Sequence, residues 1–154
     1  MEKAIFGAGC FWGVEAAFRG LTGVLSTRVG YSGGHTPNPT YKQVCTHSTN
    51  HVEVVEVIYD PSVISYPQLL SVFWKIHNPT TKNRQGPDIG SQYRSVIFFL
   101  SKEQQEQALD SLQEAQQRLS NPIVTEILAA QVFYEAEDYH QQYHEKNGGS
   151  CSYG

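Results

Sequence analysis

The sequence has few charged residues and no concentration of positive charge. Asp, Glu, Lys and Arg make up 17% of the 154 residues, and the net charge is −4. Typical globular domains carry about a quarter charged residues. A nucleic-acid-binding protein usually presents a basic patch that attracts phosphates. The composition therefore argues against a nucleic acid as partner.

Long apolar runs are also missing. No run approaches the roughly 20 residues that a helix needs to span a bilayer. Met1-Glu2-Lys3 leads directly into the first predicted strand, without the apolar stretch of a signal peptide. We therefore expect a cytoplasmic protein that does not enter a membrane. The length suits one domain with its own core, so we predict a single domain over residues 1–154, as a monomer.

Cysteine is scarce and never forms a C-x-x-C pair. The three cysteines are Cys10, Cys45 and Cys151. They are too few and too scattered for a disulfide scaffold. Without C-x-x-C, zinc ribbons and thioredoxin-type motifs are excluded. The thiols are left to act individually, and we expect no metal or organic cofactor.

The order of apolar and turn-forming segments predicts an α+β fold. The first part of the chain follows a β-α-β-β-α-β order, the split βαβ or ferredoxin-like arrangement. We predict a two-layer sandwich with this core, an additional helix–strand–helix and a coil-like, mobile tail over 145–154. Strands are predicted at 3–7, 24–31, 51–59, 93–100 and 123–130, helices at 11–20, 65–78, 101–119 and 136–145, and long loops at 32–50 and 79–92.

Cys10 stands where a predicted strand gives way to a predicted helix. The unpaired N–H groups at a helix start favour an anion, so the nucleophilic thiolate is favoured there. A single cysteine is more often a small buried residue. The three glycines within residues 7–13 and the adjoining Phe11 and Trp12 favour a reactive thiol instead. The third glycine lies one residue later than the G-x-G-x-x-G pattern of a dinucleotide-binding loop requires, so we reject a dinucleotide-binding site here.

Glu53 is a carboxyl on a mostly apolar strand. Alternation places it on the same face as Val55, Val57 and Tyr59. Burial there would favour the protonated form, and a neutral carboxylic acid can act as a general acid. The alternative is a solvated glutamate at the open end of the strand, and the residues alone leave both open.

The remaining candidates each have an ordinary explanation. Tyr41 and Tyr93 could donate hydrogen bonds or simply pack. Asp88 could contact a polar ligand or be a loop charge. Cys151 lies near the chain end in a glycine-rich stretch. It is either an accidental exposed thiol or a resolving cysteine that forms a disulfide with an oxidised partner. Cys45 looks like a packed residue, although a redox role stays open.

The predicted helix at 136–145 carries a weak metal-binding pattern. His140 and His144 are spaced i, i+4 and could share a zinc ion. The glutamate of the H-E-x-x-H motif is absent, which argues against a metalloprotease. With Glu137, these residues are better explained as the polar face of a terminal helix.

Taken together, six segments resemble the A type of peptide-methionine sulfoxide reductase, almost end to end. Asn50 and Val52 stand where that family usually has Gly and Ala, while the glutamate is kept. The segments are Gly9-Cys10-Phe11-Trp12-Gly13, Gly30-Tyr31-Ser32-Gly33-Gly34, Tyr41-x-x-Val44-Cys45, His51-Val52-Glu53-Val54-Val55, Gly86-Pro87-Asp88-Ile89-Gly90-Ser91-Gln92-Tyr93-Arg94-Ser95 and Ala136-Glu137-Asp138-Tyr139-His140-Gln141.

The resemblance implies roles for the candidate residues. Cys10 would attack the sulfoxide sulfur of the S epimer of methionine sulfoxide, free or in proteins. Glu53 would protonate the sulfoxide oxygen, with hydrogen bonds from Tyr41 and Tyr93. The family also implies a methyl pocket formed by Phe11 and Trp12 and a polar contact from Asp88. The sulfenic acid formed on Cys10 would condense with a second thiol. We choose Cys151 for this thiol because the tail can reach, and thioredoxin would then reduce the Cys10–Cys151 disulfide.

Two hypotheses from other classes stay open at this point. One is a cysteine hydrolase in which His51 or His140 acts as base for Cys10. It would turn over acyl esters without any reductant. The other is a non-catalytic redox sensor or binding module, in which a thiol is oxidised without release of a product.

Overall fold

A computed structural model describes residues 1–143 and 146. Cys151, His144 and almost all of the predicted tail therefore lie outside the described residues. The sheet has six strands in the order β7-β6-β1-β3-β2-β8. These strands are β1 (Glu2–Ala8), β2 (Val24–Ser32), β3 (Val52–Tyr59), β6 (Ser95–Phe99), β7 (Glu126–Ala129) and β8 (Tyr134–Glu135).

The strand directions define a mixed sheet. The five strands from β6 to β8 pair antiparallel, whereas β7 pairs parallel with β6. Helix α1 (Phe11–Arg19) connects β1 to β2, and helix α3 (Tyr66–Lys75) lies between β3 and β6 along the chain. The predicted α+β class is confirmed.

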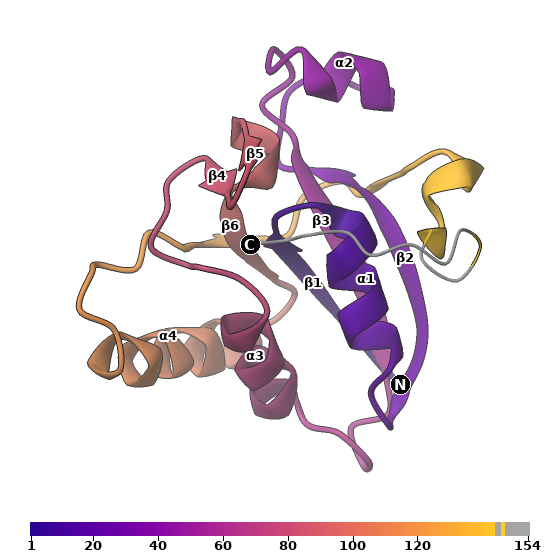
Figure 1. Ribbon diagram of the computed structural model, residues 1–154. Coiled ribbons are helices and arrows are strands. Elements are labelled where there is room, and N and C mark those ends of the chain that lie inside the picture. Colours follow the sequence, from indigo (N-terminus) through magenta and orange to yellow (C-terminus); the bar gives the residue numbers. More distant parts are fainter. Residues whose placement is uncertain (144–145, 147–154) are drawn as a thin grey trace.

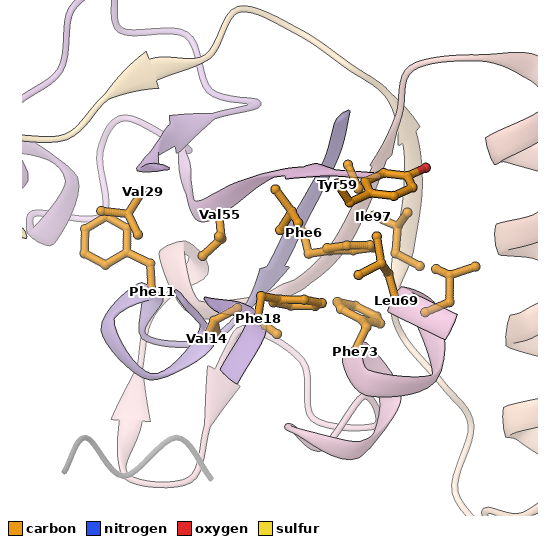
Figure 2. Packing of buried hydrophobic residues seen from close by; sticks show 14 of the residues in the cluster. Phe6, Phe11, Val14, Phe18, Val29, Val55, Tyr59, Leu69, Phe73 and Ile97 are labelled. Atoms are coloured by element: carbon orange, nitrogen blue, oxygen red, sulfur yellow. The ribbon is translucent and has the colours of Figure 1, made fainter. Parts of the chain in front are cut away.

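Helices cover one face of this sheet (Figure 1). The main core joins residues of α1, α3 and α4 (Lys102–Gln117) to the inward-facing residues of the strands. At its centre Phe6 stacks on Phe18, with ring centroids 5.1 Å apart, and approaches Phe73 at 5.4 Å (Figure 2). A smaller cluster, which includes Val54 and Phe98, lies on the other face beneath Phe133.

Two helix starts agree with their sequence signals. Ser65 caps α3 through a capping box with Gln68. Ser101 caps α4 by accepting a hydrogen bond from the backbone N–H of Gln104. The Gln104 side chain instead donates to the carbonyl of Lys3, which ties this helix start to β1.

The two predicted loops contain more regular structure than expected. Residues 32–50 include helix α2 (Tyr41–Cys45), which Thr40 caps in a capping box with Gln43. That S/T-x-x-Q spacing is a sequence signal that could have revealed the helix. Residues 79–92 include a small hairpin of β4 (Arg84–Gln85) and β5 (Asp88–Ile89), followed by the 3₁₀ turn η1 (Ser91–Tyr93). Tyr93 therefore lies in a turn rather than opening a strand.

The predicted helix over 136–145 is wrong for residues 136–142. The chain there forms the 3₁₀ turn η2 (Asp138–His140), and the additional elements are α4, β7 and β8 rather than helix–strand–helix. The side chain of Gln141 exchanges hydrogen bonds with the backbone of Val29 on β2. Gln142 follows with φ 48°. These contacts with distant residues outweigh the local helix preference.

Asn50 enters β3 in the left-handed region, with φ 58°. Asparagine tolerates this conformation better than other residues with a Cβ, and glycine adopts it freely. We predict that Asn50→Val lowers the free energy of unfolding by about 1–2 kcal/mol. Urea denaturation measures this difference. Asn50→Gly is the matched control and should stay within about 0.5 kcal/mol of the parent. Equal stability of the two variants would show that the left-handed conformation carries no cost.

Among the described residues, no helix combines the length and apolar character that crossing a membrane would require.

Candidate active site

Cys10 occupies the N-cap position of α1, as its neighbours in the sequence predict. The preceding Gly9 has φ 102°, a conformation that residues with a Cβ rarely adopt. A Cβ at Gly9 would also lie 3.0 Å from the side chain of Gln85. The Cys10 side chain is only 8% exposed, so the thiol lies at a helix start but beneath the surface.

Glu53 lies against the same helix start. Its carboxylate Oε1 accepts a hydrogen bond from the backbone N–H of Phe11 at 3.1 Å. The residue is 1% exposed and sits on the helix-covered face of β3, as the alternation predicts. The solvated alternative is therefore wrong. Thiol and carboxyl come from residues 43 positions apart and meet at one end of α1.

Tyr41 and Tyr93 come from the two segments that were predicted to be loops. Tyr41 is the first residue of α2, and Tyr93 is the last residue of η1. The segments are tied together by a hydrogen bond between His47 Nδ1 and Gln92 Oε1, at 2.8 Å. Figure 1 shows α2 and the β4–β5 hairpin at the end of the sheet where α1 begins. Both phenols are thereby brought to the Cys10 end of the molecule.

Burial keeps both phenols protonated. Burial, followed by the charge of Glu53, raises the pKa of Tyr41 and of Tyr93 well above the usual value. Smaller electrostatic contributions that raise the pKa of Tyr93 come from Cys45, Asp88 and Cys10. Both tyrosines can therefore donate a hydrogen bond across the physiological pH range.

Asp88 and Cys45 lie at the edges of this group. Asp88 is half-buried on β5, and burial raises its pKa. Burial also raises the pKa of the Cys45 thiol, although a hydrogen bond from Tyr41 opposes the rise. Cys45 therefore lies next to Tyr41, at the edge of the candidate site.

Phe11 and Trp12 differ in exposure. Phe11 is 1% exposed, with its ring between those of Tyr31 and His140. Trp12 is half-buried and stacks on Tyr143 with centroids 3.9 Å apart. Its indole N–H donates to His140 Nδ1 at 2.9 Å.

Sequence reasoning missed several residues that shape this region. The amide of Gln85 is fully buried and exchanges hydrogen bonds with the backbone of Asn78. The side chain of Gln85 also lies against Gly9, beside Cys10. Gln92 links the two loops. His140, considered from the sequence as a zinc ligand or a base, instead contacts the aromatic residues beside Cys10. No spacing pattern indicates these structural roles, because the partners of the three side chains are distant in the sequence.

The two histidines that could have served a hydrolase are used elsewhere. His51 Nδ1 accepts from the backbone N–H of Gly34, and Nε2 lies 2.7 Å from the carbonyl of Thr36. Both ring nitrogens of His51 thus organise the turn before β3. Nδ1 of His140 accepts from Trp12. Because Nδ1 accepts in both rings, the proton of each neutral imidazole is on Nε2, so neither ring can take a proton from Cys10 as the base of a Cys–His pair.

A family model described as peptide methionine sulfoxide reductase matches residues 2–153. The chain belongs to the peptide methionine sulfoxide reductase MsrA family. It is 63% identical over 150 residues to peptide methionine sulfoxide reductase MsrA of Methanosarcina acetivorans, covering 96% of this chain and 80% of that protein. The resemblance noted from six segments is confirmed, and the protein is a methionine sulfoxide reductase rather than a hydrolase or a passive sensor.

Solved structures agree with this MsrA assignment. Methionine sulfoxide reductase A of Corynebacterium diphtheriae superposes with a TM-score of 0.93 at 42% identity, covering 97% of this chain and 77% of that one. Mxr1 of Saccharomyces cerevisiae in complex with Trx2 gives a TM-score of 0.67 at 25% identity, covering 99% and 86%. The fold therefore follows that of characterised MsrA enzymes.

Proposed function

We propose that this MsrA reduces the S epimer of methionine sulfoxide, free or in proteins, with Cys10 as nucleophile and Glu53 as general acid. The observation that carries the proposal is the position of both groups at one helix start. Cys10 occupies the N-cap position of α1, and Glu53 accepts from the next backbone N–H at 3.1 Å. A protonated carboxyl beside a nucleophilic thiol is the pair that sulfoxide reduction needs, because sulfoxide oxygen leaves poorly unless protonated.

The reductive step transfers one oxygen atom. The Cys10 sulfur attacks the sulfoxide sulfur while Glu53 donates a proton to the sulfoxide oxygen. The oxygen then passes to Cys10, which becomes a sulfenic acid, and methionine leaves with its sulfur reduced. One thiol and one sulfoxide thus give one sulfenic acid and one thioether. In this scheme Glu53 regains a proton before the next turnover.

The surrounding side chains would select and orient the substrate. The phenols of Tyr41 and Tyr93 donate to the sulfoxide oxygen, since burial keeps both protonated. The half-buried indole of Trp12 would contact the methyl group, with the buried Phe11 contributing apolar packing beside Cys10, and Asp88 would make a polar contact. One face for the methyl and another for the oxygen would distinguish the two epimers of a chiral sulfoxide.

Recycling would use a second thiol and a reductant. Cys151 condenses with the sulfenic acid of Cys10, releasing water and forming a disulfide. Thioredoxin then reduces this disulfide, a step supported by the complex of the related Mxr1 with the thioredoxin Trx2. A cytoplasmic location fits, because thioredoxin is kept reduced there. We infer a monomer, with residues 1–154 as one domain.

The core of that domain is best described as ferredoxin-like. Strands β6, β1, β3 and β2 are neighbours in that order, and α1 and α3 each lie between two strands that a third strand separates. This interleaving of two βαβ units supports the split βαβ description.

A mass spectrum after addition of methionine sulfoxide without reductant tests the proposal. We expect the protein to lose two hydrogen atoms while methionine is released, with the new disulfide joining Cys10 to Cys151. Methionine release with a retained sulfenic acid would remove Cys151 from the mechanism. Absence of methionine would overturn the proposed chemistry.

Replacement of the second thiol separates chemistry from recycling. Cys151→Ser should release about one methionine per enzyme and then stop when thioredoxin is the only reductant. Cys45→Ser is the matched comparison, because Cys45 is the other thiol that could condense with Cys10. It should continue to turn over. The reverse result would make Cys45 the resolving cysteine.

A further inference from the structure

The segment Glu137–Tyr143, here called the clasp, runs beside the proposed site and is anchored at its far end. The side-chain amide of Gln141 accepts from the Val29 N–H at 2.9 Å. It donates to the carbonyls of Val29 and Ala136, each at 2.9 Å. The Val29 carbonyl also accepts from the backbone N–H of Ala136 at 3.0 Å, so the amide binds the β2 backbone directly beyond its pairing with β8. The position of the clasp is therefore set by the edge of the sheet.

A second anchor joins the clasp to helix α1. The backbone N–H of Gln142 donates to Glu15 Oε1 at 2.8 Å, and its side chain donates to Oε2 at 3.1 Å. Glu15 is 1% exposed, and its carboxylate also accepts from Thr27. Buried charged hydrogen bonds of this kind are among the stronger ones in proteins. The helix that begins at Cys10 is thereby tied to the clasp.

Glu137 contacts Tyr41 through the backbone. Its Oε2 accepts from the backbone N–H of Tyr41 and its Oε1 from the phenol of Tyr31, both at 3.1 Å. Burial acts to raise the pKa of Glu137, but these hydrogen bonds outweigh it and hold the pKa below its usual value. The carboxylate therefore stays ionised at the N-terminus of α2, where Tyr41 is the first residue.

His140 and Tyr143 hold Trp12 from two directions. His140 is fully buried, and its Nδ1 accepts the indole N–H of Trp12 at 2.9 Å. Nδ1 can accept only while it carries no proton, so the bond requires a neutral imidazole. Burial lowers the pKa of His140, against a smaller opposing effect of Glu137, and favours that form. Tyr143 stacks on the indole, with an angle of 10° between the rings.

These contacts converge on the two residues assigned to substrate orientation. The His140 ring also packs against Tyr41, with centroids 4.4 Å apart. We propose that Glu137, His140 and Tyr143 are positioning residues: the clasp sets the indole of Trp12 and the phenol of Tyr41 against Cys10. The proposal rests on the roles given to Trp12 and Tyr41 in the proposed function. His140 and Tyr143 would position Trp12 to bind the methyl group. Glu137 would align Tyr41, the hydrogen-bond donor.

Indole N–H resonances in an NMR spectrum of the full chain report the His140 contact directly. The sequence has two tryptophans, and Trp74 donates to Ser111 far from the site, so its resonance is an internal check of folding. His140→Phe should move the Trp12 indole resonance upfield and leave that of Trp74 in place. His140→Asn keeps an acceptor close to the position of Nδ1 and should restore much of the shift. An unmoved Trp12 resonance in a folded His140→Phe protein would overturn the clasp.

The dependence of the first-turnover rate on the concentration of S-methionine sulfoxide gives a limiting rate and a half-saturating concentration, written KM below, and these separate the two functions of the clasp. His140→Phe and Tyr143→Leu should raise the KM roughly tenfold, about the effect of one buried hydrogen bond, with His140→Asn closer to the parent. Glu137→Gln should lower the limiting rate by a similar factor with little change in KM. Asp138→Asn, at an exposed position of the same turn, is the control and should change neither.

Two further results complete the test. Equal losses in Glu137→Gln and Asp138→Asn would overturn the positioning role of Glu137. Trp12→Phe should raise the KM at least as much as His140→Phe. An unchanged KM in Trp12→Phe would show that the proposed role of Trp12 in substrate binding is wrong. Failure of the clasp proposal would be seen separately, as an unmoved Trp12 resonance in the NMR experiment.

Discussion

We expect Cys10→Ser to abolish methionine formation. Oxygen in place of sulfur cannot accept the sulfoxide oxygen to form a sulfenic acid, and a serine hydroxyl is far less nucleophilic near neutral pH. The substitution should leave the fold intact, because a hydroxyl fits the N-cap position of α1 well. Release of methionine from the S epimer, measured with dithiothreitol as reductant, should fall to the rate without enzyme.

The matched comparison is Cys45→Ser, which removes a thiol near the site without touching the helix start. That variant should keep forming methionine. Any turnover by Cys10→Ser above the background rate would place the nucleophile elsewhere and overturn the mechanism. A coincident loss in both variants, with unchanged circular dichroism, would indicate that the two thiols act together.

We expect Glu53→Gln to slow the reductive step by roughly 10²–10⁴-fold, the usual cost of removing a general acid. The amide keeps the shape of the side chain and can still accept from the Phe11 N–H, so α1 retains its partner. It cannot deliver a proton to the sulfoxide oxygen. A rapid-quench measurement of the first turnover isolates this step from recycling.

Glu56→Gln provides the control on the same strand. Glu56 is also buried but faces away from the site and pairs with Arg28 at 2.9 and 3.0 Å. Breaking that pair should lower stability while the rate of the first turnover stays within a few-fold of the parent. If Glu53→Gln and Glu56→Gln slow the first turnover equally, the acid is not Glu53.

The local elements followed from residues that are close in the sequence. Cys10 lies directly before α1 because a buried strand, two glycines and a helical pattern follow one another within about a dozen residues. The two-residue alternation of β3 determined that Glu53 and Glu56 lie on opposite faces. Ser65 and Ser101 marked two helix starts for the same reason, since a cap depends on the next three residues.

The failures have one cause. The segment 136–142 has a helical pattern, yet it forms only the 3₁₀ turn η2 and a following turn, because Gln141 binds the backbone of Val29 across 112 residues. The loops at 32–50 and 79–92 lacked periodicity, and a bond between His47 and Gln92 determines how they meet. Such contacts leave no trace in spacing along the chain, because they depend on which elements fold side by side.

By itself, the sequence determined the family, the candidate nucleophile, the candidate acid and the class of fold, because each depends on short segments whose chemistry is local. Only the tertiary structure decided that Glu53 binds the first N–H of α1, and that both long loops meet at one end of the sheet. It also brought His140 beneath Trp12, from 128 residues further along the chain. A site assembled from distant segments is specified by packing, which fixes distances that no local pattern contains.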